Sequence, residues 1–185
     1  MAAMVRKLCF AAALAVLAAA GAGVDCPCDP EKPETLKLRQ CSLCELAEQQ
    51  PPQPAVFFVK DRSPMKPNRW LALPRKHWLG DHPLDEMSAA ERTELWTAAI
   101  EKAKSLWGDE WGVAYNGGQV RTQCHAHIHI GRLLPLRLID TDNFIVVRGP
   151  AEIPSPKGAG MWIHPMNGKL HVHLPEQRAE TVLYR

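Results

Sequence analysis

The sequence lacks an excess of charge of either sign. Its 22 Lys and Arg residues are balanced by 20 Asp and Glu residues, which gives a formal net charge of +2 at pH 7. Arg6 and Lys7 lie in an N-terminal segment that we expect to be removed, so the remaining chain is close to neutral. This balance gives no indication of nucleic-acid binding, which depends on a basic surface that neutralises phosphates.

The sequence also lacks an apolar run long enough for a comfortable membrane span. The run Leu8–Ala20 is shorter than the roughly 20 residues that a bilayer requires. It follows Arg6 and Lys7 and ends at the small residues Ala20-Gly21-Ala22, which is the pattern of a secretory signal. We expect residues 1–22 to be a signal peptide cleaved near Ala22, and the protein to be exported, either periplasmic or secreted. A retained membrane anchor is the alternative.

Internal repeats are absent, as are low-complexity segments after the signal. A chain of 185 residues is long enough for one domain with a core. We expect an irregular, cysteine-containing arm over residues 23–40 and a main domain over residues 41–148. A C-terminal β extension over residues 149–185 should pack on the same domain.

Local patterns indicate the secondary structure. Ser88 and Glu91 have the spacing of a capping box and predict a helix that continues to about Trp107. The buried stripe of this helix should include Leu95, Ala99, Lys102 with Ala103, and Leu106. A shorter helix is expected over residues 41–50. Strands are expected over residues 56–59, 70–73, 112–115, 144–147, 162–164, 170–174 and 181–184. One long helix among such strands predicts an α+β domain with an antiparallel sheet.

The most informative stretch is Arg121–Gly131, where apolar and polar residues alternate as in a half-buried strand. Residues two apart share a face of a strand. The face expected to point into the core carries Cys124, Ala126, Ile128 and Ile130. The opposite face carries Arg121, Gln123, His125, His127 and His129. Three imidazoles beside an amide and a guanidinium suit metal binding or phosphoryl transfer, in which a neutral imidazole attacks phosphorus.

The spacing His125-x-His127-x-His129 followed by Ile130 resembles the histidine-triad (HIT) superfamily. The form Arg-Thr-Gln-x-His-x-His-Ile-His-Ile is also similar to the CDP-diacylglycerol pyrophosphatase branch of that superfamily. The resemblance extends to the Pro-basic-His segment that ends at His77 and to the Asn-Gly turn at Asn116. It covers roughly residues 41–132 and implies a HIT-like fold, with Arg69 and Trp70 where the family often has another His.

The resemblance implies a hydrolase or transferase that acts on phosphoanhydride bonds. His127 would be the nucleophile, forming a covalent nucleotidyl-histidine held in the right tautomer by the backbone carbonyl of His125. His129 would help the leaving group depart, while Asn116 and Gln123 would contact the substrate. We assign Arg121, which shares their face, to a second phosphate, with a surface ion pair as the alternative. The chemistry itself requires no cofactor.

The expected partner is a small-molecule nucleotide or a nucleotide-lipid, and an exported enzyme could meet the latter at a membrane surface. Many members of the family are homodimers. A metal- or nucleotide-binding module without turnover is the alternative function. A thiol redox protein that uses Cys41 and Cys44 is a third reading, although the βαβ context of such proteins is missing.

The cysteines allow two interpretations. Exported proteins form disulfides, and Cys26, Cys28, Cys41 and Cys44 permit three pairings among themselves. Cys26 and Cys28 could also pair with each other or stay labile. By resemblance, Cys41, Cys44, His77 and His125 would instead bind a structural zinc ion.

A second group of histidines lies near the C-terminus. A two-residue turn at Asn167-Gly168 would pair His164 with His171 and Trp162 with His173. All four side chains would then share one face of a hairpin. That face could bind a metal ion, or present cations to a phosphate when protonated, or simply be an exposed polar face.

Overall fold

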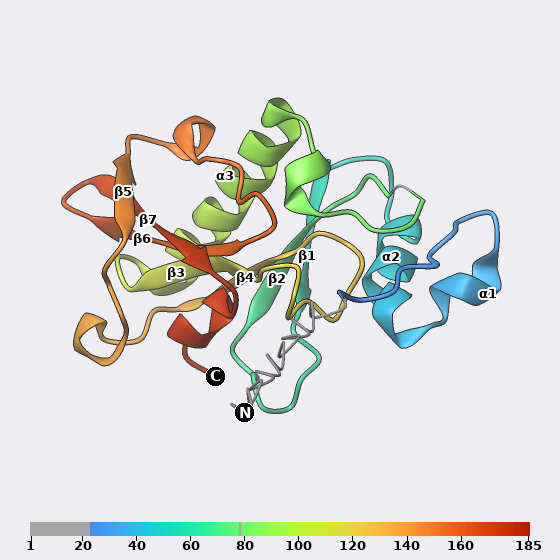
Figure 1. The fold of residues 1–185 in the computed structure, drawn as a ribbon, viewed down its shortest axis with the longest axis horizontal. Helices are drawn as coiled ribbons and strands as arrows, with labels where there is room; N and C mark the ends of the chain where they lie inside the picture. The colour runs from blue at the N-terminus through green and yellow to red at the C-terminus, as the bar shows by residue number, and fades with distance from the viewer. Residues whose placement is uncertain (1–22, 78) are drawn as a thin grey trace, which may run out of the picture.

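The computed structural model describes residues 23–77 and 79–185, so the expected signal peptide lies outside the described residues. The described chain forms an α+β domain around a seven-stranded antiparallel sheet (Figure 1). The strand order is β1-β2-β4-β3-β6-β7-β5. The strands are β1 (Val56–Lys60), β2 (Trp70–Pro74), β3 (Trp111–Tyr115), β4 (Ile128–Arg132), β5 (Phe144–Val147), β6 (Gly160–Met166) and β7 (Lys169–Glu176).

The long helix α3 (Ala89–Trp107) begins at the expected capping box. The Ser88 side chain accepts a hydrogen bond from the Glu91 backbone, and the Glu91 side chain accepts one from the Ser88 backbone. The helix buries Leu95, Trp96, Ala99, Ile100 and Ala103 against the sheet. The prediction that Leu106 is buried was wrong: Leu106 is 40% exposed, and the neighbouring Trp107 packs against the core in its place.

The two faces of the sheet are covered differently. One face, which carries Val113, Ile128 and Ile163, packs against α3. The opposite face is covered at one end by α2 (Ser42–Glu48), whose Leu43 and Ala47 contact Leu71. Further along this face the short helix η5 (Ala179–Val182) covers Ala114 and Trp162. The remaining elements are α1 (Pro33–Leu36), η1 (Arg39–Cys41), η2 (Leu84–Glu86), η3 (Leu136–Leu138) and η4 (Pro150–Glu152).

Two expected strands differ from the structure. The strand expected to begin near Arg121 begins at Ile128, and residues 116–127 form a loop between the neighbouring strands β3 and β4. Backbone groups of this loop bond outside the sheet: the Cys124 N–H donates to the Gln40 carbonyl. The segment expected as a last strand contains η5 instead, with a single bridge between Leu183 and Leu133.

The N-terminal arm is fixed by two disulfides. Cys26 pairs with Cys124 and Cys28 pairs with Cys41, while Cys44 remains free and buried. Cys26 and Cys28 therefore do not pair with each other, and Cys124 is not a free thiol in the core. Both bonds tie the arm to segments that surround the histidines. No helix in the described part of the chain combines the length and apolarity needed to cross a bilayer.

Candidate active site

His127 and His129 line a cavity of about 470 Å³ on the face of the sheet opposite α3. The walls come from α2, the loop after β1, the loop 116–127 and η5. The other lining residues are Arg39, Ser42, Leu43, Leu46, Val59, Lys60, Asp61, Arg62, Ser63, Lys66, Leu71, Asn116, Val120, Thr122, Gln123 and Glu180. The cavity thus combines an apolar wall with a surface rich in Lys and Arg.

His127 is held as a neutral imidazole of one tautomer. Its Nδ1 lies 2.9 Å from the backbone carbonyl oxygen of His125. A carbonyl only accepts hydrogen bonds, so the ring proton resides on Nδ1 and Nε2 keeps its lone pair. Burial lowers the pKa of His127, and the positive charge of Arg121 lowers it further. The side chain is therefore a neutral imidazole at pH 7, the form in which a histidine can act as a nucleophile.

His129 stands beside His127, with the two ring centroids 4.9 Å apart. Its Nε2 lies 3.4 Å from the amide nitrogen of Asn116, which places the ring proton on Nδ1. Nδ1 lies 3.5 Å from a carboxylate oxygen of Glu180, a distance typical of an ion pair but without hydrogen-bond geometry. Burial holds the pKa of His129 well below its usual value, and the neighbouring His127 acts in the same direction.

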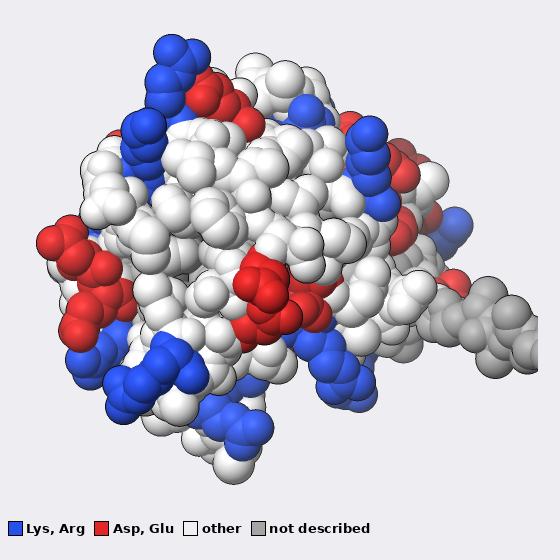
Figure 2. Space-filling view, turned by 60° about the vertical axis from the view of Figure 1, so that its left-hand side comes forward, with Lys and Arg blue, Asp and Glu red and all other residues white. Residues whose placement is uncertain are grey.

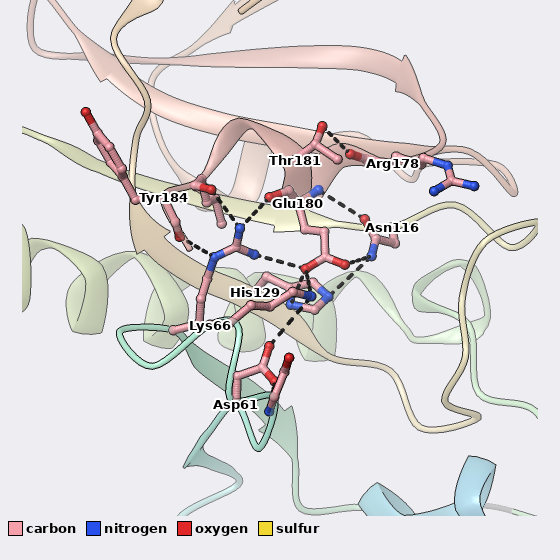
Figure 3. Close-up of polar contacts among 11 residues, drawn as sticks. Asp61, Lys66, Asn116, His129, Arg178, Glu180, Thr181 and Tyr184 are labelled. Atoms are coloured by element: carbon pink, nitrogen blue, oxygen red, sulfur yellow. Dashed lines mark hydrogen bonds and ion pairs between the residues drawn. The ribbon is translucent and has the colours of Figure 1, made fainter.

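Glu180 is a site residue to which no pattern in the sequence points. Its carboxylate lies among His129, Lys66 and Asn116 (Figure 3), with Lys66 Nζ 2.5 Å and Asn116 Nδ2 3.2 Å from its two oxygens. The Asn116 side chain also accepts a bond from the Glu180 backbone N–H, at 3.0 Å. Burial alone would raise the pKa of Glu180, but His129 when protonated, Lys66 and Arg69 outweigh it and bring this pKa to about 2.

Arg69 holds the C-terminal segment in the position that places Glu180 beside His129. Its guanidinium is only 2% exposed and donates to the backbone carbonyls of Glu180, Leu183 and Tyr184 at 2.7–2.8 Å. It also donates to the Glu180 carboxylate at 2.9 Å. Through these bonds Arg69 anchors the C-terminal segment.

Arg121 and Gln123, which we expected to contact substrate, are both bonded to other protein groups in the structure. Arg121 does not line the cavity: its Nη2 lies 2.6 and 2.7 Å from the two carboxylate oxygens of Asp81. It therefore forms an ion pair, although its side chain is buried and not on the surface as the alternative assumed. Gln123 does line the cavity, but its amide is already bonded to Ser42 and to the Arg39 carbonyl. Both differences follow from the loop, which does not keep the alternation of a strand.

His125 also leaves the expected face. Its Nε2 lies 2.8 Å from the carbonyl oxygen of Pro74, and the ring is fully buried away from the cavity. Burial, partly opposed by this hydrogen bond, lowers the pKa of His125 to about 3. His125 therefore contributes its backbone carbonyl to the site, while its ring belongs to a second cluster.

That cluster joins His125 to Cys44 and His77, whose potential ligand atoms lie within 4.8 Å of one another. His77 Nε2 and His125 Nδ1 are buried without a hydrogen-bond partner, and His77 Nδ1 is held by Glu48 at 3.0 Å. Burial raises the pKa of the Cys44 thiol to about 12 in the absence of a cation. These residues could hold a metal ion. The expected fourth ligand is not free, because Cys41 is bonded to Cys28.

The comparisons with known proteins add evidence on the fold alone. No family model matches the chain, and no curated protein matches it. The chain is similar to the crystal structure of a DUF4931 family protein from Bacillus cereus ATCC 10987, with a TM-score of 0.50 and 12% sequence identity. The match covers 68% of this chain and 84% of that one.

Proposed function

We propose that this protein is a HIT-like hydrolase or transferase that acts on phosphoanhydride bonds through a covalent nucleotidyl intermediate on His127. The observation that carries this proposal is the hydrogen bond from His127 Nδ1 to the His125 carbonyl. It leaves the Nε2 lone pair of a neutral imidazole at a cavity that combines Lys and Arg side chains with an apolar wall.

The proposed reaction has two displacements at one phosphorus atom. Nε2 of His127 attacks, the bond from phosphorus to the leaving oxygen breaks, and the departing phosphate takes the electron pair. Water, or another acceptor in a transferase, then attacks the same phosphorus, gives up a proton to solvent and releases His127. His129 and Asn116 line the cavity beside His127. Their mutual contact would open when substrate binds, so that the Asn116 amide donates to a phosphate oxygen and His129, once protonated, donates from Nε2.

The lining of the cavity supports a nucleotide or a nucleotide-lipid as substrate. Arg39, Lys60 and Arg62 offer positive charge to a pyrophosphate. Leu43, Leu46 and Leu71 offer apolar contact to a base or to the first part of a lipid. A CDP-diacylglycerol-type substrate meets both requirements. Export of the protein is supported by its two disulfides, which persist in oxidising compartments.

A structural zinc ion belongs to the same proposal. Cys44, His77 and His125 would hold it, because two buried ring nitrogens without partners and a buried free thiol converge there. Bound zinc would brace the residue whose carbonyl orients His127. A metal-binding module without turnover is the second candidate function, and this cluster is the observation that favours it.

The decisive experiment is a substrate panel on the mature chain, with nucleoside diphosphates, dinucleotides and CDP-diacylglycerol. Wild type should turn over at least one class and show a nucleotidyl adduct by intact mass after rapid quenching. His127→Ala should form no adduct and lose at least about 100-fold in rate, since the nucleophile is missing. His171→Ala, which changes a histidine outside the cavity, is the matched control and should keep the wild-type rate. A His127→Ala variant with more than about a hundredth of the wild-type rate would contradict covalent catalysis.

A further inference from the structure

Three histidines far from the cavity lie together on the last two strands of the chain. β6 and β7 are joined by the turn Asn167-Gly168, where both residues have positive φ (52° and 73°), as a two-residue hairpin turn requires. The register pairs His164 with His171 and Trp162 with His173, as the turn predicts. One nitrogen from each of His164, His171 and His173 lies within 4.8 Å of the others.

The surroundings orient two of these rings. His164 Nδ1 lies 3.2 Å from the Pro165 carbonyl oxygen, and His173 Nδ1 lies 3.4 Å from the Asp142 carbonyl oxygen. Each contact places the ring proton on Nδ1 and leaves the Nε2 lone pair available. A backbone carbonyl on the other ring nitrogen is the usual support of a metal-binding histidine. His173 Nε2 is buried and has no hydrogen-bond partner.

Burial and aromatic stacking also surround the rings of the cluster. Burial, with the neighbouring His173 and His171, lowers the pKa of His164 to about 4, and burial lowers the pKa of His173. Trp162 stacks on His173 with centroids 3.6 Å apart, and Phe144 of β5 stacks on His171 at 4.6 Å. Figure 2, which turns the β5 side toward the viewer, shows a broad area there without Lys, Arg, Asp or Glu.

The cluster is separate from the cavity but belongs to the same face of the sheet. Ala114 pairs with His129 on one side and with Trp162 on the other, and Trp162 pairs with His173. His129 and His173 are therefore three strand spacings apart, about 14 Å. The helix η5 covers Ala114 and Trp162 between them, and none of the three histidines lines the cavity.

We propose that His164, His171 and His173 form a binding site for a divalent transition metal, Zn²⁺ or Cu²⁺. Three imidazoles suit these ions, whereas Mg²⁺ and Ca²⁺ prefer oxygen ligands, and no carboxylate belongs to this cluster among the residues that the structure describes. Three protein ligands leave a fourth position for water or an incoming ligand. Two of the ligands come from β7 and one from β6, so the metal would cross-link the hairpin beside the exposed edge strand β5.

The test measures zinc binding to the mature chain, prepared without a histidine tag and stripped of metal with a chelator. His171→Phe and His173→Phe keep an aromatic ring stacked on Phe144 and on Trp162 but remove the ligand nitrogen. Each should weaken one zinc site by at least about 100-fold in competition with a chromophoric chelator. Their thermal midpoints without zinc should stay close to that of the wild type.

Two control variants separate this site from the other clusters. His77→Phe removes a ligand from the Cys44 cluster, and His129→Phe removes one from the group that includes Asp61 and Glu180. Neither should change the zinc site that His171→Phe removes. In NMR spectra, zinc should shift the ring signals of His164, His171 and His173 in wild type and in both controls. The proposal is overturned if His171→Phe keeps the wild-type stoichiometry and affinity, if these ring signals do not move, or if only His77→Phe or His129→Phe loses zinc.

Discussion

The negative charge of Glu180 bears both on the stability of the fold and on the protonation of His129. A half-buried carboxylate is destabilising unless cations or hydrogen-bond donors surround it. Lys66, Arg69 and Asn116 supply them, and the same carboxylate faces Nδ1 of His129. The negative charge favours the proton-bearing form of His129, although burial outweighs it and keeps the ring neutral at pH 7. In the proposed reaction, His129 would therefore donate a proton to the leaving oxygen only once the negative charge of the substrate favours its protonated form.

The first prediction concerns acid stability. The pKa of Glu180 is about 2 in the folded chain, below the value of 4.5 expected for an unfolded Glu. A carboxylate with a lowered pKa stabilises the folded state fully above pH 4.5 and loses this contribution as the pH falls toward 2. Glu180→Gln should therefore be less stable than wild type at pH 6, by up to about 3 kcal/mol, and this difference should shrink below pH 4.5.

Chemical denaturation at a series of pH values measures this difference. Glu152→Gln is the control, because Glu152 pairs with Arg148 on the exposed surface and its removal should change stability little at any pH. The prediction fails if the unfolding free energy of Glu180→Gln, plotted against pH, stays parallel to that of wild type down to pH 3. The contacts of Glu180 with Lys66, Arg69 and Asn116 would then not depend on its charge.

The second prediction concerns Arg69, whose planar guanidinium reaches three carbonyls and one carboxylate at once. Lys carries the same charge but has no fork of donors, so Arg69→Lys leaves buried carbonyls without partners. We expect a loss of at least about 2 kcal/mol in unfolding free energy and a lower turnover, because Glu180 is no longer held at His129. Arg132→Lys, which changes an exposed Arg paired with Glu110, should alter both quantities little. Equal effects of the two substitutions in denaturation and activity assays would contradict the anchoring role of Arg69.

At the scale of secondary-structure elements, the sequence predicted the helices and strands whose ends are marked by local residue patterns. The capping box of Ser88 and Glu91 and the β-rich runs gave α3 and most strands to within a few residues. The alternation of polar and apolar residues from Arg121 to His127 predicted a strand where the structure has a loop. Residues 116–127 form hydrogen bonds and a disulfide with distant segments instead of pairing in the sheet. The Cys124 N–H donates to Gln40, the Cys124 carbonyl accepts from His82, and its thiol is bonded to Cys26. Such tertiary partners override a periodic pattern.

The third prediction concerns the place where β3, β6 and β7 converge. A Cβ atom on Gly160 would lie 2.3 Å from the Glu176 carbonyl oxygen and 2.4 Å from that of Tyr115. Both neighbours are backbone atoms of adjacent strands, so they cannot move aside without breaking the sheet. Gly160→Ala should lower the unfolding free energy by at least about 2 kcal/mol. Gly149→Ala is the matched control, since its Cβ would meet no atom within 4 Å and its backbone is extended. Similar denaturation midpoints for the two variants would show that the strands can separate at Gly160.

At the scale of the whole molecule, the candidate site joins segments that are far apart in the sequence. His127 and His129 come from one short motif, and both line the cavity. Glu180 and Arg69 are 111 residues apart, and their contact depends on how the C-terminal segment folds back over the sheet. No local pattern carries such information, and the same reason hid the pairing of Arg121 with Asp81. The sequence thus predicted that His127 and His129 lie side by side, but not the charges that surround His129.

The last prediction compares the two disulfides. Cys26–Cys124 closes a loop of 98 residues and Cys28–Cys41 one of 13. In the chain-entropy description, the longer loop stabilises by about 4–5 kcal/mol and the shorter by about 3. Replacing Cys26 and Cys124 together by Ser should therefore cost about 2 kcal/mol more than replacing Cys28 and Cys41. The first pair should also reduce turnover more, because Cys124 directly precedes His125, whose carbonyl orients His127. Denaturant titration and initial rates of both double variants measure these effects. If the variant without Cys28 and Cys41 loses more unfolding free energy and more turnover, the cross-link within the N-terminal arm matters more than the one that holds the loop before His127.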